Sequence, residues 1–457
     1  MTRDPEHSDG HLGPHADAPL ADPALAFPLD PALHRALADT RHAAGDELGA
    51  VAHLIAAHTL DAYASGSAEA SAANLCDVAT GYFMKGDLDI AAGWYQLVLT
   101  LDPSVAIACQ NLAAIHASAG RTAEADAFRE RAYRIQRVFV EEAPGQVRRV
   151  LVLCAARASG NVPFEALLPG AVNCRIKYAI DYAADADDEQ LPPFDLVFNA
   201  IGEPDIAAPL TGRLTRFTSR VTHPVLNPPA AIEPTARNRT PALLGELHDV
   251  QLAACARIDA APSSDVALAG LLAEHGIARP VLARPAATHG GEGLVRCDSL
   301  AALQARLRES PCPQYLTAFR DTRSADGYYR KYRMIFVDRQ PIPYHLAISP
   351  KWMVHYESSG MDAHPDRLAE EMRFLDDPAT ALGEAAMAAV AQVGAALDLD
   401  YGGIDFSLLP DGRALLFEAN ATMLVHPEAP DGPYAHKNPA IERIYAAFRA
   451  MLAARPA

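Results

Sequence analysis

Two acidic residues and an amide near the C-terminal end of the chain, Asp405, Glu418 and Asn420, are spaced so that they can act together. If they lie on paired strands, the two carboxylates face each other and repel, so their pairing is unfavourable without a cation. A hard cation such as Mg²⁺, or Mn²⁺ in its place, takes oxygen ligands of this kind. The set predicts a divalent-metal site, and the alternative is a solvated face of an antiparallel sheet.

The segment Tyr401–Met423 is typical of a β-hairpin that would bring these side chains together. Two largely apolar runs flank Asp411-Gly412, a dipeptide that favours a two-residue hairpin turn. Counting outwards from that turn, Asp405 opposes Glu418 and Gly403 opposes Asn420. The same alternation places four apolar residues together on the opposite face: Ile404, Phe406, Leu415 and Phe417.

A strand rich in basic residues precedes this hairpin. In Tyr328–Val337, alternation places Lys331 and Arg333 on one face, where two cations repel unless an anion lies between them. A turn leads into a second strand, Pro343–Ile348, which carries His345. The basic face predicts an anion site, and a solvated basic edge is the alternative.

A glycine-rich loop follows a short strand earlier in the chain. The strand Pro280–Pro285 carries Arg284 and runs into the loop. Glycines allow backbone N–H groups to approach anionic oxygens closely, so such a loop can cover phosphates. It lacks the G-K-[ST] of a P-loop and no helix follows it, so an ordinary hairpin turn is the alternative. The loop residues are His289, Gly290, Gly291 and Gly293.

Bulk composition limits the class of protein. The chain has 457 residues, half of them hydrophobic, which is enough for two or three domains. A net charge of −18 argues against a general nucleic-acid binder. The seven cysteines show no C-x-x-C, no apolar stretch has the length of a membrane span, and no signal peptide is evident. We therefore expect a cytoplasmic protein that binds neither nucleic acid nor membrane.

The N-terminal third of the chain is helical and repetitive. Residues 1–30 are rich in Pro, Asp, His and Ala and predict a disordered arm. From residue 31 the sequence is self-similar at an offset of about 34 residues, the length of a tetratricopeptide repeat, and this offset pairs Gly86 with Gly120 and Ala91 with Ala125. These segments resemble about three such repeats. They would form a groove for a peptide or partner protein, or else a packing or homodimerisation module.

The next segment changes pattern to short apolar strands. Val150–Cys154, Cys174–Ala179 and Asp195–Asn199 alternate with loops and helices, which predicts an α/β domain. Further on, Gln314–Phe319 is typical of another strand. Residues 365–398 predict a long helix or pair of helices, and residues 437–454 a closing helix.

Together these pieces resemble the ATP-grasp superfamily, close to its glutathione-synthetase-like and ribosomal-S6-modification-like ligases. The resemblance covers roughly residues 148–455 and depends on the order of the pieces. An α/β domain precedes a basic residue at a helix start, Arg239. A strand with Arg284 enters the glycine-rich loop, a strand with Arg333 follows, and a D…E-x-N hairpin comes last.

The resemblance implies roles for the matching residues. Asp405, Glu418 and Asn420 would hold Mg²⁺ on the phosphates of ATP, and Arg333 would contact the γ-phosphate and the developing acyl phosphate. Arg284 would contact the α and β phosphates, with Arg239 as an earlier basic contact. The loop His289–Gly293, including Gly290 and Gly291, would cover the phosphates. Adenine would lie near Leu316, Thr317 and Phe319.

Four positions depart from the family's usual pattern. Arg284 stands where most members have Lys, Lys331 where many have an acid, and Met423 where proline is common. The strand Gln314–Phe319 lacks the usual Glu, which puts the adenine contacts in doubt. None of these changes removes a metal ligand.

The resemblance implies an ATP-dependent carboxylate–amine ligase that acts through an acyl phosphate on a peptide or small substrate, as in natural-product biosynthesis. Arg333 and Lys331 would lie at the reaction centre, and His345 is a candidate base or a packing residue. Lys351 and His355 are looser candidates for holding the second substrate. The alternatives are a repeat scaffold with a degenerate nucleotide fold, and a phosphotransferase on the same fold.

The expected architecture is therefore multidomain. An arm covers residues 1–30, a helical domain similar to tetratricopeptide repeats covers 31–145, and an α/β domain covers 146–235. An α+β ATP-grasp domain covers residues 236–457.

Overall fold

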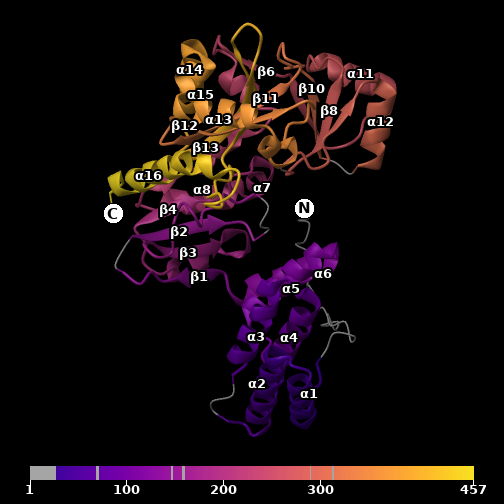
Figure 1. Ribbon diagram of the computed structural model, residues 1–457, viewed down its shortest axis with the longest axis vertical. Coiled ribbons are helices and arrows are strands. Elements are labelled where there is room, and N and C mark those ends of the chain that lie inside the picture. The colour runs from indigo at the N-terminus through magenta and orange to yellow at the C-terminus, as the bar shows by residue number, and fades with distance from the viewer. Residues whose placement is uncertain are drawn as a thin grey trace, which may run out of the picture. The chain divides into compact units, whose positions relative to one another are not determined.

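The structure is a computed structural model that describes residues 27–67, 71–145, 148–156, 160–288, 290–310 and 313–456. Most of the predicted arm, and His289 of the glycine-rich loop, lie outside the described residues. The chain divides into two compact units, Met1–Gln136 and Arg137–Ala457. Figure 1 labels the elements of both.

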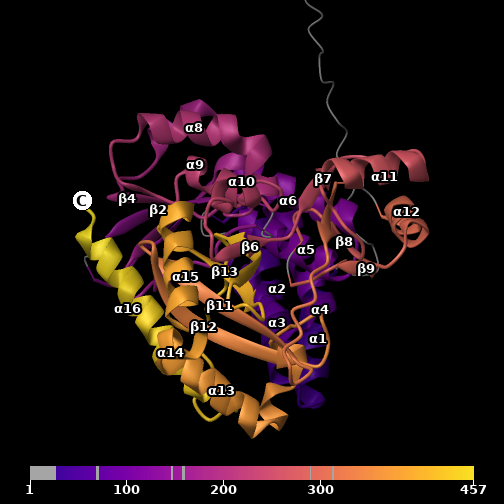
Figure 2. The same ribbon diagram turned by 90° about the horizontal axis from the view of Figure 1, so that it is seen from above.

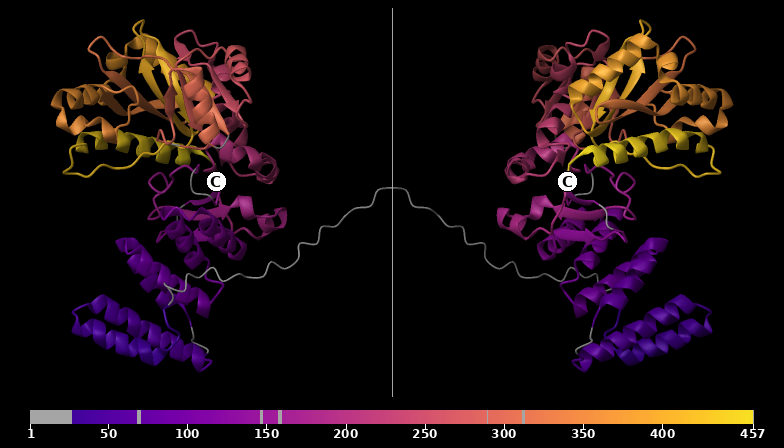
Figure 3. Two further views of the ribbon diagram at one scale, coloured as in Figure 1. Left: turned by 90° about the vertical axis from the view of Figure 1, so that its right-hand side faces the viewer. Right: turned by 90° about the vertical axis from the view of Figure 1, so that its left-hand side faces the viewer.

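The first unit is a stack of helix pairs. Successive helices pair as α1 with α2, α3 with α4, and α5 with α6, and Figure 3 shows them in indigo to purple. Gly86 caps α3 and Gly120 follows α5, both with positive φ, so the predicted offset joins equivalent turns. The predicted helical region is confirmed, and its assignment as tetratricopeptide repeats stays a prediction. The helices are α1 (Pro31–Ala43), α2 (Glu47–Ala64), α3 (Ala73–Lys85), α4 (Leu88–Leu101), α5 (Ala106–Ser118) and α6 (Thr122–Ile135).

An aromatic cluster with two histidines closes the first pair of helices onto α4. Phe27 stacks on Trp94 with ring centroids 3.9 Å apart. His34 and His53 are buried, their Nδ1 atoms lie 2.9 Å apart, and the His34 Nε2 bonds to the Pro28 carbonyl at 2.8 Å. Burial lowers the pKa of both rings, and for His53, where the charge of His34 adds to burial, the pKa falls to about 4.

Protonation of these histidines should destabilise the first unit. The folded-state pKa of His53 lies below its unfolded value of about 6.5. Its full contribution to the free energy of unfolding is therefore present above pH 6.5, and this contribution falls as the pH drops towards 4. At pH 5 we expect a loss of about 2 kcal/mol relative to pH 7.5. Thermal unfolding followed by Trp94 fluorescence, in a Trp352→Phe background, measures it.

A matched pair of variants assigns the effect. His53→Gln keeps a hydrogen-bonding side chain that does not titrate, so it should weaken the pH dependence. His42→Gln changes an exposed histidine of α1 and should leave it intact. An unaltered pH dependence in His53→Gln would contradict the assignment.

The second unit begins with a mostly parallel five-stranded sheet, in the order β1-β3-β2-β4-β5. Its central strands β2 and β4 are buried on both faces, which explains their continuous apolar runs. Leu151 and Leu153 pack against Leu214 of α8 on one face, and Val152 packs with Phe448 of α16 on the other. The elements are β1 (Val138–Glu141), β2 (Arg149–Cys154), β3 (Cys174–Ala179), β4 (Leu196–Asn199), β5 (Val225–Leu226), α8 (Thr211–Arg220) and α16 (Asn438–Ala454).

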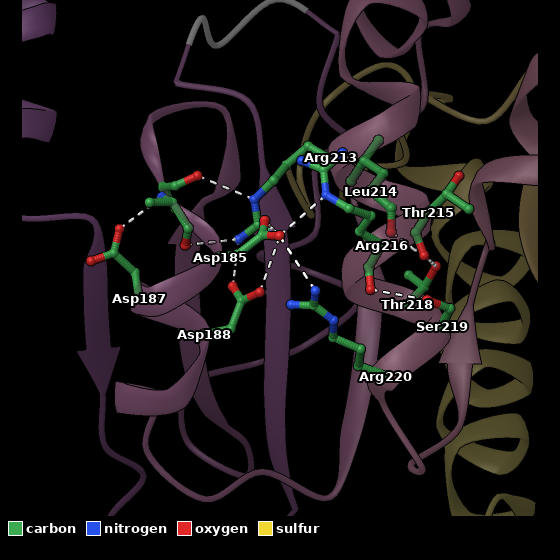
Figure 4. Close-up of polar contacts among 12 residues, drawn as sticks. Asp185, Asp187, Asp188, Arg213, Leu214, Thr215, Arg216, Thr218, Ser219 and Arg220 are labelled. Carbon is green, nitrogen blue, oxygen red and sulfur yellow. Dashed lines mark hydrogen bonds and ion pairs between the residues drawn. The ribbon is translucent and has the colours of Figure 1, made fainter.

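A half-buried ion pair joins α8 to the connection that follows β3. Arg213 donates to Asp188 at 3.1 Å and to the Ala183 carbonyl at 3.1 Å, and the Tyr178 hydroxyl donates to Asp188 at 2.8 Å. Figure 4 shows Arg213 reaching from α8 towards this acidic 3₁₀ segment, Asp185–Gln190. Burial of Tyr178 beside Asp188 raises the pKa of that phenol. The network serves the fold of this sheet.

Strand β1 was not anticipated from the sequence. It lies ahead of residue 146 and pairs antiparallel with β3, from Val138 opposite Tyr178 to Glu141 opposite Arg175. Glu141 also bonds to Lys177 at 2.5 Å. The sheet therefore extends to residues expected to belong to the helical domain.

This pairing can be tested by truncation. A chain that begins at Arg137 retains β1, whereas one that begins at Gln146 exposes the edge of β3. We expect the shorter chain to unfold about 5 °C or more below the longer one, by calorimetry at one pH. Equal unfolding temperatures would show that β1 adds nothing to the second unit.

A four-stranded antiparallel sheet follows, in the order β7-β10-β8-β9. Figure 1 shows α11 and α12 beside it, and their leucines Leu268, Leu272, Leu303 and Leu307 form a core with Leu316. Ser264 and Ser299 cap the two helices through bonds to backbone N–H groups. The elements are β7 (Cys255–Ile258), α11 (Asp265–Glu274), β8 (Val281–Pro285), β9 (Val295–Cys297), α12 (Leu300–Glu309) and β10 (Gln314–Ala318).

The third sheet carries the predicted metal hairpin and has the order β12-β11-β13-β14-β6. Met334, Ile404 and Phe406 on one face pack against α13 and α15, which lie along one side of the sheet in Figure 2. The helix or helix pair expected over residues 365–398 is three helices. The elements are β6 (Val250–Leu252), β11 (Tyr329–Val337), β12 (Gln340–Ser349), α13 (Pro365–Asp376), α14 (Pro378–Leu382), α15 (Glu384–Leu397), β13 (Tyr401–Leu408) and β14 (Ala414–Asn420).

Short helices complete the second unit: α7 (Pro204–Ala207), α9 (Pro229–Ile232) and α10 (Thr240–Leu244). Among the described residues, no helix is both long enough and apolar enough to cross a bilayer.

Candidate functional site

A cavity of about 1000 Å³ lies in the second unit, between its four-stranded antiparallel sheet and its third sheet. One wall comes from β8, β10 and the glycine-rich loop, and the other from β11, β12, β13 and β14. Ligand pockets usually hold roughly 300–1,000 Å³, so this cavity has room for a nucleotide and a second substrate.

The predicted carboxylate pair is present at this cavity. Asp405 of β13 opposes Glu418 of β14, and Gly403 opposes Asn420, as the sequence predicts. Asp405 is 2% exposed, and all three oxygen-bearing side chains line the cavity. A Cβ on Gly403 would lie 2.6 Å from the Met334 carbonyl, so glycine allows β13 to approach β11 here.

The turn that sets this register differs from the prediction. The Leu409 N–H donates to the Arg413 carbonyl, so the loop contains three residues rather than two. A bulge between Asp405 and Phe406 restores the register, because Phe406 pairs with Leu416 and Phe417 is the extra residue.

The bulge corrects the predicted apolar face. Phe406 pairs with Leu416, and Leu416 lies with Ile404 and Phe406 in the core. Leu415 opposes Ser407 on the cavity side, and Phe417 is 42% exposed. The placement of Leu415 and Phe417 with Ile404 was therefore wrong.

Two cations of β11 hold Asp405. Arg333 donates to both carboxylate oxygens, from Nε at 2.6 Å and from Nη2 at 2.9 Å, and the Lys331 Nζ lies 3.1 Å away. Burial alone would raise the pKa of Asp405, but Arg333 and Lys331 hold it well below its usual range. For Arg333, burial lowers the pKa and Asp405 raises it by more. The carboxylate is therefore ionised at neutral pH.

Two further arginines approach Glu418. Arg237 forms an ion pair with it, and the Arg284 Nη1 lies 3.8 Å from the same oxygen. Burial opposes ionisation, yet Arg237, with smaller contributions from Arg284 and Arg333, lowers the pKa of Glu418 to about 2. Burial, together with the charge of Arg237, lowers the pKa of Arg284 to about 10. Two guanidinium groups that share one carboxylate form a site with excess positive charge.

The donor set suits a hard divalent cation. Two ionised carboxylates face each other at a cavity wall. In proteins, Mg²⁺ usually binds one or two carboxylates together with the phosphate oxygens of a substrate. The Asn420 Oδ1 already accepts from the N–H and the hydroxyl of Thr422, each at 2.6 Å. The carboxylates of Asp405 and Glu418 are therefore the stronger ligands of the predicted three.

One predicted phosphate contact lies elsewhere. Arg239 is exposed, forms an ion pair with Glu233, and does not belong to the cavity lining. Arg237, two residues earlier, lines the cavity in its place. Both arginines lie in Arg237-Asn-Arg239, and the sequence carries no period there that would distinguish them.

Some residues of the glycine-rich loop and of β10, the strand expected to lie near adenine, line the cavity. Gly290 and Gly291 line it with positive φ, and a Cβ on Gly291 would lie 2.5 Å from the His355 Nε2. Thr317 and Phe319 also line the cavity, whereas Leu316 lies in the core of its sheet and Gly293 packs against Pro285.

A bulge brings two successive residues of β12 to the cavity. Arg333 pairs with His345 and Met334 with Pro343, so Tyr344 is the extra residue. Burial, then the charge of Arg333, lowers the pKa of His345 well below its ordinary value. The imidazole is therefore neutral, and its Nε2 has no hydrogen-bond partner within the described structure.

A second charged cluster at the cavity was not predicted. Lys437 is 1% exposed and forms an ion pair with Glu428, and both residues line the cavity with Tyr344 and Tyr356. Glu428 and Lys437 follow the hairpin, Glu428 in an irregular segment and Lys437 at the end of one 3₁₀ turn, so neither spacing nor alternation connects them. Of the looser candidates, His355 lines the cavity, whereas Lys351 is exposed and absent from the lining.

No protein-family model and no curated protein match the chain. Solved structures do. The first is carboxyaminoimidazole ribonucleotide synthase from Aspergillus clavatus in complex with ATP, at 14% identity over 61% of this chain and 71% of that one, with a TM-score of 0.39. The VanG D-Ala:D-Ser ligase from Enterococcus faecalis follows, at 11% identity over 66% of this chain and 100% of that one, with a TM-score of 0.40.

A third similar structure is a RiPP-associated ATP-grasp ligase from Chryseobacterium gregarium in complex with ADP and a leader and core peptide. It is 13% identical over 67% of this chain and 97% of that one, with a TM-score of 0.37. These proteins are ATP-grasp ligases. They belong to the superfamily that the sequence motifs resemble. TM-scores of this size are too low to assign a function, which depends here on the geometry of the cavity.

The two arginines of Arg237-Asn-Arg239 form a matched test of the site. Arg237→Met should weaken MgADP binding about tenfold or more, because a cation of the cavity wall and the partner of Glu418 are lost. Arg239→Met should leave binding unchanged, because its side chain is exposed. Titration calorimetry with MgADP measures both. Equal effects of the two variants would contradict the assignment.

Proposed function

We propose that the chain is an ATP- and Mg²⁺-dependent carboxylate–amine ligase that forms an amide bond through an acyl phosphate. The observation that carries the proposal is the charge balance at one cavity wall. Four cations surround two ionised carboxylates, which leaves an excess of positive charge in a partly buried site. The cations are Arg237, Arg284, Lys331 and Arg333.

A magnesium–nucleotide complex satisfies both signs of charge at once. Its phosphates suit the four cations, and its metal suits Asp405 and Glu418. When bound, Mg²⁺ would join phosphate oxygens to these carboxylates and offset charge on the transferring phosphoryl group. Arg237 and Arg284 face Glu418 from one side, whereas Lys331 and Arg333 face Asp405 from the other. The chain therefore offers cations to both ends of a triphosphate.

The chemistry uses these residues in two steps. An oxygen of the donor carboxylate attacks the γ-phosphorus, so an O–P bond forms while the bond to ADP breaks. Arg333 and Lys331 stabilise the transferring group and the acyl phosphate. An amine then attacks the acyl carbon and phosphate leaves. The amine would have to arrive unprotonated, because the lowered pKa of His345, the candidate base that pairs with Arg333 in the register, makes this imidazole a weak base.

We assign the second substrate to the part of the cavity beyond Arg333, and a peptide or an amino acid is in keeping with its size. The helix pairs of the first unit would offer a groove for a peptide or partner, or a surface for homodimerisation. The described cysteines are free, which suits the reducing cytoplasm.

A phosphotransferase with the same cavity is the second candidate, because the charge cluster serves phosphoryl transfer in either case. A ligase releases ADP at a rate that depends on an added amine, and a phosphotransferase does not. A helical scaffold with a degenerate nucleotide fold would bind MgADP without turnover across broad panels of carboxylates and amines.

Removal of one carboxylate tests the proposal directly. Glu418→Gln keeps shape and hydrogen bonding but removes the charge that faces the metal. We expect ADP release from ATP to fall at least about 100-fold, the usual scale for one lost electrostatic contact to a transition state. Far-UV circular dichroism should show that the chain stays folded at 25 °C, although the unfolding midpoint should fall because Arg237 loses its partner.

Glu442→Gln, which changes an exposed glutamate of α16, is the matched control and should retain full turnover. Turnover of Glu418→Gln at the wild-type rate would remove the metal role and, with it, the reason for assigning ATP to this cavity.

A further inference from the structure

A cation of the chain already lies against one of the predicted metal ligands. The Lys331 Nζ is 3.1 Å from Asp405, and Arg333 donates to both oxygens of the same carboxylate at 2.6 and 2.9 Å. Lys331 lines the cavity and keeps 16% of its side chain exposed, so a ligand in the cavity can reach its ammonium. The ammonium therefore lies beside the place where a metal and phosphates would bind.

The oxygens of this donor set have few lone pairs left for metal ions. An ionised carboxylate offers about four lone-pair sites, and an amide oxygen about two. On Asp405, three cationic nitrogens lie within hydrogen-bond distance of the two oxygens. On Asn420, the Oδ1 accepts from the N–H and from the hydroxyl of Thr422, each at 2.6 Å. Together Asp405 and Asn420 keep about one lone-pair site for a metal.

Most of the remaining capacity belongs to Glu418. Arg237 pairs with one of its carboxylate oxygens, and the Arg284 Nη1 lies 3.8 Å from that oxygen, beyond hydrogen-bond distance. Among the residues that the structure describes, no third His, Cys, Asp or Glu joins Glu418 and Asp405 in a metal-ligating group. One Mg²⁺, which usually takes one or two carboxylates plus phosphate oxygens, would use these ligands fully.

The charge balance of the site leads to the same number of metal ions. Its four cations and two carboxylates leave two positive charges in excess. A triphosphate carries about four negative charges, and one Mg²⁺ reduces them to about two, which the side chains neutralise. A second Mg²⁺ would leave about two positive charges without partners in a partly buried site, where an unpaired charge is costly.

We propose that the site holds one divalent ion per nucleotide, and that the Lys331 ammonium takes the place of a second ion. Sites that use two ions for phosphoryl transfer place them about 3.5–4 Å apart, where they stabilise the attacking and the leaving oxygens. In this chain Glu418, with one oxygen of Asp405, would hold the single ion, and Lys331 would supply the other positive charge to the phosphates. The inference rests on the proposed function and assigns to a side chain the work of a metal.

The number of metal ions bound by the full chain tests the proposal without any variant. The chain is mixed with the non-hydrolysable ATP analogue AMPPNP and titrated with Mn²⁺, and electron paramagnetic resonance measures the free metal. We expect one Mn²⁺ per bound nucleotide and the spectrum of an isolated ion. A second ion that binds within tenfold of the first, or the spectrum of a magnetically coupled pair, would overturn the inference.

Variants then assign the count to its residue. Lys331→Met frees an oxygen of Asp405 and removes one positive charge, so two Mn²⁺ should bind and give the spectrum of a coupled pair. Lys331→Arg keeps the charge and should bind one ion, as the wild type does. Lys177→Met, which removes another strand lysine from its ion pair with Glu141, is the matched control and should also bind one.

The outcomes separate this inference from the proposed function. If the wild type binds no AMPPNP in the presence of Mn²⁺, the proposed function itself fails. If the wild type binds the nucleotide with two ions, the proposed function stands and the role of Lys331 alone is overturned. A single ion in Lys331→Met would also overturn that role, because something other than the ammonium would then exclude the second metal.

Discussion

The structure of the second unit depends on two carboxylates that face each other on adjacent strands. Asp405 and Glu418 are a like-charged cross-strand pair in a partly buried site, so each requires a nearby cation to remain ionised. Removal of one partner of a buried ion pair, such as Asp405 with Arg333, costs about 3–5 kcal/mol, a large part of the 5–15 kcal/mol that stabilises most domains. This constraint fixes β11 on one side of the pair and the segment of Arg237 on the other.

Irregularities in the strands meet that constraint. The bulge at Phe417 keeps Glu418 opposite Asp405, and the bulge at Tyr344 presents two successive side chains of β12 to the cavity. The start of β13 is fixed separately, because buried Asn227 accepts from the backbone N–H groups of Asp400 and Tyr401 at 2.9 and 3.0 Å. Regular strands alone would not present these side chains together.

The sequence predicts the site where residues share a strand pair and fails where they do not. The predicted pairing of Asp405 with Glu418 is correct because two deviations offset each other. The turn is one residue longer than the Asp-Gly signal indicates, and the bulge at Phe417 restores the predicted register. Local pattern could not distinguish Arg237 from Arg239, since tertiary packing alone decides which side chain is buried. Glu428 lies in an irregular segment and Lys437 ends one 3₁₀ turn, so the sequence offered no period that connects them.

The two charge clusters of the cavity differ in their balance, and this difference indicates which of them binds the nucleotide. The cluster around Asp405 and Glu418 has more cations than acids, which matches the net negative charge of a magnesium–nucleotide complex. The pair of Lys437 and Glu428 is neutral overall, so neither charge lacks a partner. Because buried charge is stable only when it is paired, the nucleotide complex would exchange ion pairs within the chain for equivalent pairs with its phosphates and its metal.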